Sequence, residues 1–156
     1  MKIKIKKLIE EAVVPVRAHP TDAGMDITAT SKEVTSKFIE YGIGLSLEIP
    51  TGYVGLIFPR SSISKTNLTL ANSIAVIDSN FRGEVRLRFD RRDHDSSSLS
   101  YNIGDRIGQI IIMPYPEYEY EVVEELDDTD RGVGSFGSTD SVKLEYKKDP
   151  RKGTEL

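Results

Sequence analysis

The chain has 156 residues, enough for one domain with a hydrophobic core. Charged residues make up 29% of it and the formal net charge is −4, so the composition does not predict a nucleic-acid-binding surface. There is no cysteine, which excludes disulfides and thiolate chemistry. The two histidines, His19 and His94, are far apart in sequence and do not favour a zinc site. An acidic protein that binds a polyphosphate must concentrate its cations locally.

The N-terminal residues 1–6 alternate lysine with isoleucine, a pattern that predicts an edge strand protected by its charges. The longest apolar run in this region is too short for a signal peptide or a membrane span. We therefore expect a soluble, cytoplasmic protein that does not contact a membrane.

Short predicted strands recur along the chain, with turn residues between them. They cover residues 1–6, 23–27, 42–49, 53–58, 74–77, 83–89, 106–113 and 118–123. No long window has helical periodicity, and residues 62–65 predict a single helical turn at most. The sequence therefore predicts an all-β fold, mostly antiparallel, built as a sandwich or a barrel.

The C-terminal part of the chain differs in composition from the rest. Residues 124–130 form an acidic linker, and residues 131–156 contain too few apolar side chains to pack independently. We therefore expect a β domain over residues 1–130 and a flexible arm over residues 131–156.

The most unusual stretch joins two predicted strands at residues 68–88. Asp78 ends the apolar strand 74–77, Ser79 and Asn80 predict a turn, and an alternating strand follows. We expect these two strands to pair as a hairpin, with a carboxylate and an aromatic ring, Phe81, held at the corner between them. An aspartate in this place is most often a turn former, so the local pattern alone leaves its role open.

Three shorter stretches carry further candidate site residues. Arg60 stands beside two hydroxyls in PRSS, which suits phosphate oxygens, although a solvated loop is the commoner explanation. Gln109 is a polar residue within an apolar strand, where its amide must find hydrogen-bond partners. Asp26 begins another strand, and Gly24 permits close approach of the backbone.

The glycine-rich segment 131–139 combines Arg131 with hydroxyls and one aromatic residue, Phe136. Such a segment can present N–H groups to an anion, and its ring can stack on a planar ligand. A disordered tail is the alternative explanation. The segment lacks GKS or GKT and does not join a strand to a long helix, so it matches neither a P-loop nor a dinucleotide-binding motif.

Together, these five stretches resemble the five ordered motifs of the homotrimeric dUTP pyrophosphatases (dUTPases). They read AGMDI, PRSS, NSIAVIDSNFRGE, GDRIGQ and RGVGSFGST, and they run from Ala23 to Thr139. The resemblance implies a jelly-roll-like β subunit in a homotrimer whose active sites are shared between subunits. It also implies hydrolysis of dUTP to dUMP and pyrophosphate by water attack at the α-phosphorus. Mg²⁺ would arrive bound to the triphosphate rather than in a protein cage.

The resemblance further implies roles for individual residues. Asp78 would be the base that orients and deprotonates the attacking water, with Gln109 near the α-phosphate. Asn72 would pair with the uracil edge, and Phe81 would pack beneath the deoxyribose and exclude a 2′-hydroxyl. Asp26 would help to orient water around Mg²⁺. The remaining contacts, to phosphates or as a cap over uracil, would come from Arg60, Ser61, Ser62, Arg131, Phe136, Gly137, Ser138 and Thr139.

Several positions depart from the family pattern. Phe81 stands where tyrosine is usual, and Ala75 stands where glycine is common. Ser62 and Ser135 also replace frequent glycines, and Asp140 adds a negative charge near the phosphate-binding arm. None of these changes removes a group that the chemistry requires.

Two other functions remain open. The related dCTP deaminases share the fold, but the glutamate that is their catalytic base corresponds to Arg88 here, and a guanidinium cannot act as that base. A regulatory or binding protein of the same fold would instead use the loop 91–102 and the tail after Thr139 for partner contacts. Such segments are more often a solvated loop and a disordered tail.

Overall fold

A computed structural model describes residues 1–92 and 99–135 of the chain. The chain divides into two units, Met1–Tyr118 and Glu119–Leu156. All strands of the described residues belong to the first unit. Within the same described ranges, no helix is long and apolar enough to cross a membrane. The proposed division into a domain and an arm at residue 130 stays a prediction.

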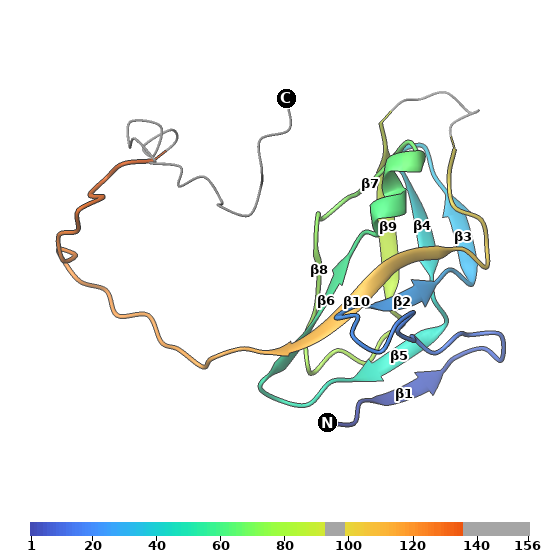
Figure 1. Ribbon diagram of the computed structural model, residues 1–156, viewed down its shortest axis with the longest axis horizontal. Helices are drawn as coiled ribbons and strands as arrows, with labels where there is room; N and C mark the ends of the chain where they lie inside the picture. The colour runs from blue at the N-terminus through green and yellow to red at the C-terminus, as the bar shows by residue number, and fades with distance from the viewer. Residues whose placement is uncertain (93–98, 136–156) are drawn as a thin grey trace, which may run out of the picture. The chain divides into compact units, whose positions relative to one another are not determined.

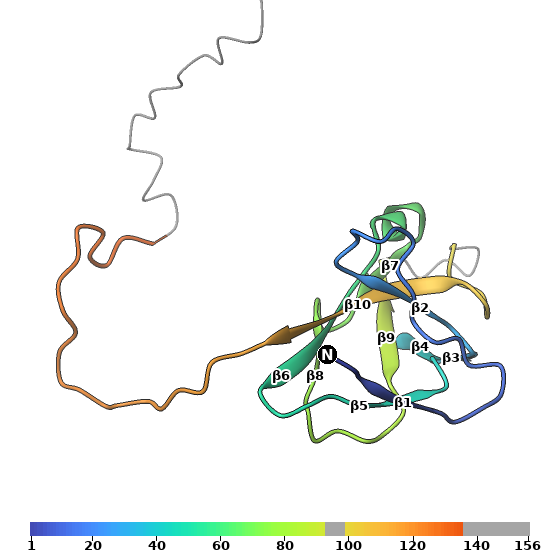
Figure 2. The same cartoon turned by 60° about the horizontal axis from the view of Figure 1, so that its bottom comes forward.

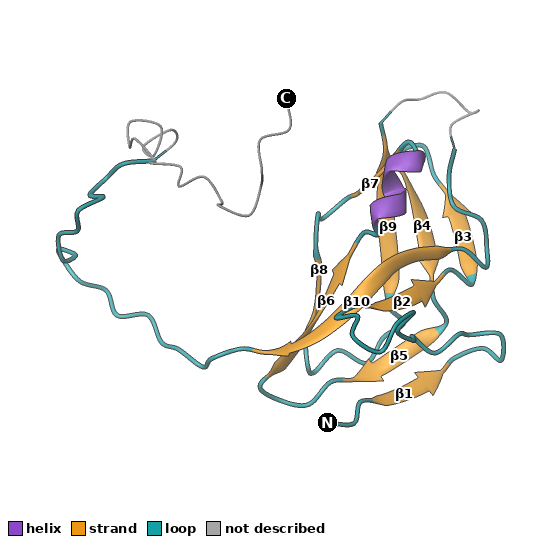
Figure 3. Ribbon diagram, in the orientation of Figure 1, coloured by secondary structure: helices purple, strands orange, loops and turns teal. Residues whose placement is uncertain are grey.

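The described part of the first unit consists of short strands and one short 3₁₀ helix (Figure 3). In chain order these are β1 (Lys4–Lys7), β2 (Met25–Thr28), β3 (Ser31–Val34), β4 (Phe38–Gly42), β5 (Leu45–Glu48), β6 (Tyr53–Phe58), η1 (Ser61–Lys65), β7 (Leu68–Leu70), β8 (Ala75–Ile77), β9 (Arg86–Arg91) and β10 (Arg106–Pro114). All strand pairs in these sheets are antiparallel. The predicted all-β, jelly-roll-like fold is confirmed.

The strands form two four-stranded sheets and one two-stranded sheet. Sheet I has the order β2-β10-β6-β8, sheet II has the order β3-β4-β9-β7, and β1 pairs with β5. Figures 1 and 2 show the long β10 lying between β2 and β6, with β1 beside β5. Because consecutive strands often belong to different sheets, the chain crosses repeatedly between the two layers.

The core lies between the inner faces of the sheets. On β9, Leu87 and Phe89 are buried while Arg86 is exposed, which confirms the predicted period of two. The Phe89 ring packs edge-on against Tyr41 and Tyr101, with 5.7 Å between ring centroids in both pairs. Burial raises the pKa of Tyr41 to about 12, and its hydroxyl donates a 3.0 Å hydrogen bond to the Tyr101 carbonyl.

Three local predictions are wrong. The predicted strand 42–49 is two strands, because Gly44 adopts a φ of 65° and turns the chain from sheet II toward the β1–β5 pair. The predicted strand 118–123 is not formed in the described structure, although its alternating pattern is clear. An alternating pattern gives a strand only where another strand pairs with it.

The third error concerns the two strands around Asp78. They do not pair with each other as a hairpin, because β8 pairs with β6 in sheet I and β9 pairs with β4 and β7 in sheet II. We call residues 71–84 the corner segment. They leave β7 of sheet II, pass through β8 of sheet I and return to β9 of sheet II. The predicted meeting of two strands at a corner is correct, but the predicted hairpin pairing is wrong.

Candidate active site

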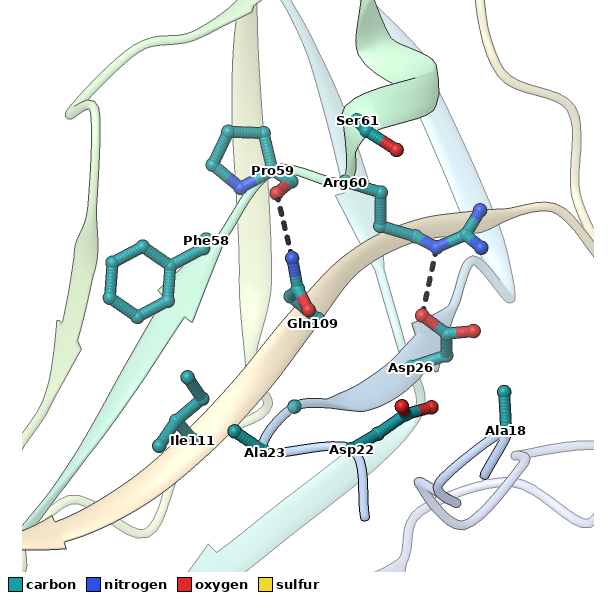
Figure 4. Close-up of a pocket in the computed structure, with 11 residues that line it drawn as sticks. Ala18, Asp22, Ala23, Asp26, Phe58, Pro59, Arg60, Ser61, Gln109 and Ile111 are labelled. Atoms are coloured by element: carbon teal, nitrogen blue, oxygen red, sulfur yellow. Dashed lines mark hydrogen bonds and ion pairs between the residues drawn. The ribbon is translucent and has the colours of Figure 1, made fainter. Parts of the chain in front are cut away.

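A cavity of about 660 Å³ opens at one end of sheet I, and we call it the arginine pocket. Its lining residues are Ala18, Asp22, Ala23, Gly24, Asp26, Phe58, Pro59, Arg60, Ser61, Gln109 and Ile111 (Figure 4). They come from the approach to β2, the end of β6 and the middle of β10. Three of the five sequence stretches therefore meet in one cavity.

The strand register explains why these stretches meet. Gln109 on β10 is opposite Asp26 on one side and opposite Phe58 on the other. Residues opposite each other in neighbouring strands point to the same face of the sheet. Pro59 then ends β6, because a proline cannot donate to the strand ladder, and Arg60 leaves the sheet beside the other two side chains.

Asp26 is the centre of a charged network in the arginine pocket. Arg60 Nε donates a 2.8 Å hydrogen bond to Asp26 Oδ1, and Arg106 Nη1 donates a 2.9 Å hydrogen bond to Oδ2. Arg60 Nη1 also lies 3.3 Å from Ser62 Oγ. Figure 4 shows Arg60 and Asp26 reaching toward each other over β10. Both carboxylate oxygens are engaged, and Arg60 is held at a defined place in the pocket.

Gln109 satisfies its amide within the same pocket. Its Nε2 donates a 3.2 Å hydrogen bond to the Pro59 carbonyl (Figure 4). A Cβ atom on Gly24 would overlap the Gln109 amide oxygen, so only glycine allows this close packing of backbone and amide. The close approach that the sequence predicted at Gly24 is thus made to Gln109.

The corner segment holds Asp78 at an exposed turn directly after β8. The Phe81 N–H donates a 3.1 Å hydrogen bond to the Asp78 carbonyl. Arg82 Nη1 donates to the carbonyls of Ser79 and Phe81, at 2.7 and 2.9 Å. The turn is therefore fixed by its own hydrogen bonds while the Asp78 carboxylate faces solvent.

A second cavity, of about 460 Å³, lies beside the corner segment, and we call it the corner pocket. It is lined by Glu40, Ala71, Asn72, Ile77, Phe81, Glu84, Val85, Arg86, Leu87 and Arg88. The Phe81 ring lies against Gly83, where an added Cβ would come within 2.7 Å of the ring carbon Cζ. Gly83 therefore sets the position of the ring.

The corner pocket also contains a charged network, centred on the buried Glu40. Arg86 Nη1 donates to Glu40 Oε1 at 2.9 Å, and Arg88 Nε donates to Oε2 at 2.7 Å. Arg86 also pairs with Glu84 at 2.6 Å, and Arg88 stacks over the Phe38 ring at 4.5 Å. These arginines, Arg88 first, hold the pKa of the Glu40 carboxyl below its usual value.

Comparison with known proteins identifies the family. The model of the dUTPase family matches residues 10–140, which is most of the chain. The chain belongs to the dUTPase family. The resemblance of the five stretches is thereby confirmed.

Individual relatives agree with the family match. The deoxyuridine 5′-triphosphate nucleotidohydrolase of Rhodococcus erythropolis is 38% identical over 146 residues, covering 89% of this chain and 86% of the relative. The protein of the same name from Nautilia profundicola is also 38% identical, and the match covers 99% of its length. A variant of the Staphylococcus bacteriophage 80alpha dUTPase, determined with dUpNHpp, superimposes with a TM-score of 0.77 at 26% identity. That match covers 88% of this chain and 98% of the phage chain.

The two groups of dUTPase motif residues lie far apart within one chain. Ile77 is opposite Gly55, so Asp78 is level with Val54, whereas Gln109 is level with Phe58. Four residues separate these levels along β6, which is about 13 Å at the usual rise of a strand. The separation across the sheet from β8 to β10 adds to this distance. Within one chain, Asp78 and Gln109 therefore lie in separate regions of sheet I.

The remaining predicted site residues belong to the second unit. Arg131 Nε donates a 3.0 Å hydrogen bond to the Gly134 carbonyl within that unit. Phe136, Gly137, Ser138 and Thr139 lie outside the described residues, as does Asp140. Their roles stay predictions.

Sequence reasoning assigned no role to two charged residues in or beside the arginine pocket. Asp22 lines the cavity, and its carboxylate accepts a 2.9 Å hydrogen bond from the His19 N–H. Arg106 lies inside the GDRIGQ stretch, yet only its contact with Asp26 gives it a place in the site. Within residues 1–92 and 99–135, no three His, Cys, Asp or Glu side chains are grouped as a protein-held metal requires.

Proposed function

We propose that the protein hydrolyses dUTP to dUMP and pyrophosphate by attack of water on the α-phosphorus. The observation that carries this proposal is the meeting of Asp26, Arg60 and Gln109 in one pocket of a chain that belongs to the dUTPase family. Similarity to curated deoxyuridine 5′-triphosphate nucleotidohydrolases over most of the chain supports the same substrate.

The arginine pocket is the proposed phosphate site. Arg60 supplies a fixed cation with five N–H donors, and two of them are already engaged by Asp26 and Ser62. The hydroxyls of Ser61 and Ser62 add further hydrogen-bond donors beside Arg60. Charge-assisted hydrogen bonds of this kind are the strong ones for phosphate oxygens. Gln109, packed on Gly24, would lie nearest the α-phosphate.

The corner segment is the proposed nucleoside site and the source of the base. The exposed Asp78 carboxylate would orient the attacking water and take its proton. Asn72 would pair with the uracil edge. The Phe81 ring, held against Gly83, would pack beneath the deoxyribose and leave no space for a 2′-hydroxyl.

We further propose that the protein works as a homotrimer with shared sites. The separation of Asp78 from Gln109 along β6 supports this proposal, in which the two residues come from different copies of the chain. The outer face of sheet I between them carries the half-buried Leu56 and the exposed Val76 and Met113, which another copy can cover. A ring that joins the corner segment of one copy to the arginine pocket of the next closes with cyclic symmetry.

The C-terminal arm completes the proposed site. Arg131 would meet the γ-phosphate, Phe136 would cover uracil, and Gly137, Ser138 and Thr139 would bind phosphate oxygens. Truncation after Asp130 tests this part separately, since it removes those groups and no strand of the described structure. Strongly reduced activity of the truncated protein, with an unchanged unfolding transition of the β domain, is the expected result.

Mg²⁺ is the proposed cofactor, entering with the triphosphate. The carboxylates of the arginine pocket fit a hydrated ion. Each Asp26 oxygen keeps a lone pair beside its arginine hydrogen bond, and Asp22 lines the same cavity, so both residues can accept hydrogen bonds from the water ligands of the ion. When bound, the ion neutralises charge on the phosphate oxygens. Asp26 and the arginines would hold the hydrated triphosphate in place.

The corner pocket argues against deamination of dCTP. At the position of the deaminase base stands Arg88, whose Nε is bonded to Glu40. Glu40 itself has a lowered pKa and two arginine partners, so it is a poor proton acceptor. Incubation with dUTP, dCTP, dTTP and UTP in the presence of Mg²⁺ separates the possibilities. Pyrophosphate release from dUTP alone is expected, whereas formation of dUTP from dCTP would support the deaminase.

Mixing two inactive variants tests the shared site. Asp78→Asn and Arg60→Gln each disable every site of their own homotrimer. After joint unfolding and refolding in equal amounts, about a quarter of the sites should combine an intact Asp78 from one chain with an intact Arg60 from another. We expect the mixture to recover dUTP hydrolysis at about a quarter of the wild-type activity. Mixed trimers that are confirmed by mass and yet remain as inactive as the parents would contradict sharing of these two residues.

A further inference from the structure

Arg106 reaches Asp26, a lining residue of the arginine pocket, because of an irregularity in β10. Gln109 and Gly108 are opposite Asp26 and Ile27, but Arg106 rather than Ile107 is opposite Thr28. Such a β-bulge inserts one extra residue and changes the face to which the following side chain points. Ile107 and Gly108 are consecutively buried, and Arg106 then emerges on the face that carries Gln109. In a regular strand, a residue three positions from Gln109 would point to the opposite face.

The bulge brings the Arg106 guanidinium to Asp26. Its Nη1 lies 2.9 Å from Asp26 Oδ2, while Arg60 holds the other carboxylate oxygen at 2.8 Å. The Asp26 side chain is 16% exposed, whereas that of Arg106 is 54% exposed. Asp26 is thus the least accessible member of the group, and Arg106 shields it from the outer side.

The charges of the three groups show what Arg106 contributes. Arg60 and Asp26 together carry no net charge, and an ion pair without net charge attracts a polyphosphate weakly. With Arg106 included, two positive charges and one negative charge leave a net charge of +1. Asp22 lines the same cavity and adds a further negative charge, so the second arginine is needed to offset the carboxylates.

We propose that Arg106 is a positioning residue of the phosphate site. It holds the Asp26 carboxylate and offsets its charge, so that Arg60 meets the phosphate as an effective cation. This inference rests on the proposed function for the identity of the anion, a nucleoside triphosphate.

The decisive variant is Arg106→Gln, with Arg92→Gln as its matched control. Arg92 is another arginine that bonds a neighbouring side chain, through Nε to Thr69 Oγ1 at 2.9 Å, but Thr69 belongs to β7 of sheet II. We expect Arg106→Gln to raise the KM for dUTP about tenfold with a much smaller change in kcat. Arg106→Lys, which retains the charge and a donor, should restore most of the affinity, and Arg92→Gln should resemble the wild type.

Binding of inorganic triphosphate and of deoxyuridine separates this role from a structural one. Arg106→Gln should weaken triphosphate binding about as much as it raises KM, while deoxyuridine binding stays unchanged. Equal weakening of both ligands, or a lowered melting temperature with a normal KM, would overturn the proposal. The triphosphate measurement needs no turnover, so it tests Arg106 even if the wild type fails to hydrolyse dUTP. Failure of the wild type to bind triphosphate would also overturn it.

A double variant tests whether Arg106 acts through Asp26. An Asp26→Asn background lacks the carboxylate that Arg106 holds, so adding Arg106→Gln there should change triphosphate affinity by less than about twofold. A full tenfold loss in that background would show that Arg106 acts independently of Asp26, and the positioning role would be wrong.

Discussion

Two carboxylates in this protein each accept hydrogen bonds from two arginines, but their surroundings differ. Asp26 in the arginine pocket binds Arg60 and Arg106, and Glu40 in the corner pocket binds Arg86 and Arg88. Neither carboxylate is well exposed: the Asp26 side chain is 16% accessible and that of Glu40 is 10% accessible. The local chemistry is nearly the same in both pockets.

The difference lies in what completes each network. Glu84 adds a second carboxylate beside Glu40, so two negative charges meet two positive charges and the group is neutral. Arg88 is further occupied by stacking over Phe38. The hydrogen-bonded group of Asp26, Arg60 and Arg106 carries a net charge of +1. It faces a cavity lined by Ser61, Gln109 and Asp22, and Asp22 bonds the His19 N–H. A closed, neutral network suits stability, whereas an open network with surplus positive charge suits an anionic substrate.

The largest effect should come from Asp78, the residue through which the corner segment contributes to chemistry. Asp78→Asn retains the size of the side chain but removes the proton acceptor. Because a positioned general base contributes about 10²–10⁴ in rate, kcat for pyrophosphate release from dUTP should fall by that factor while the fold is kept. A variant with near-normal kcat would place the base elsewhere.

Arg60→Gln should have the next largest effect, and it tests the comparison directly. Loss of one fixed donor to a developing phosphate charge costs about 10²–10³ in kcat/KM. Asp26 keeps Arg106 as a partner in this variant, so the fold should be preserved. Arg88→Gln is the matched control in the corner pocket, and it should alter kcat/KM by less than about threefold. Similar losses in both variants would mean that the two networks do not differ in function.

The sequence predicted the elements of the arginine pocket well, because each depends on local patterns. The bounds of β6 match the predicted strand 53–58, and β10 extends the predicted strand 106–113 by one residue. Gly24 and Gln109 were singled out by backbone freedom and by a polar group within an apolar run. Both properties are visible in a single chain without knowledge of its neighbours.

The remainder depends on contacts between distant segments. The face of Arg106 is set by a bulge, and a bulge inserts a residue without changing the apolar character of the strand. Glu40 gave no signal in the sequence, because its partners are 46 and 48 positions away. The strands on either side of Asp78 suggested a hairpin, but each one pairs with a strand of another segment. Strand pairing between distant segments is a tertiary property.

Glu40→Gln should reduce stability rather than activity. Charged hydrogen bonds contribute about 1–3 kcal/mol each when buried, but the arginine partners are half exposed, so we expect a total loss of about 1–3 kcal/mol in the free energy of unfolding near neutral pH. Urea unfolding measures this loss, and turnover of dUTP by the folded variant should be close to that of the wild type. A large loss of turnover at full stability would give the corner network a catalytic role.

The same variant has a defined pH dependence. Arg88 and Arg86 lower the pKa of Glu40 in the folded state, so its charge stabilises the protein above the usual value of 4.5. That contribution is lost as the pH falls from there through the lower folded pKa. The stability difference between the wild type and Glu40→Gln should therefore narrow below pH 4.5 and be largest above it. A difference that stays constant through this range would contradict a charged Glu40.

Gly83→Ala should have the smallest effect, and it tests how the corner segment selects the sugar of the substrate. An added Cβ would lie 2.7 Å from Phe81 Cζ, so the ring must move, and its partial exposure lets it do so at little cost in stability. Displacement of the ring opens space beneath the deoxyribose, and the preference for dUTP over UTP should fall up to about tenfold. In a Phe81→Leu background there is no ring to displace, so Gly83→Ala should cause almost no further loss. An unchanged preference in the single variant, measured as the ratio of kcat/KM for dUTP and UTP, would show that ring position does not control the choice of sugar.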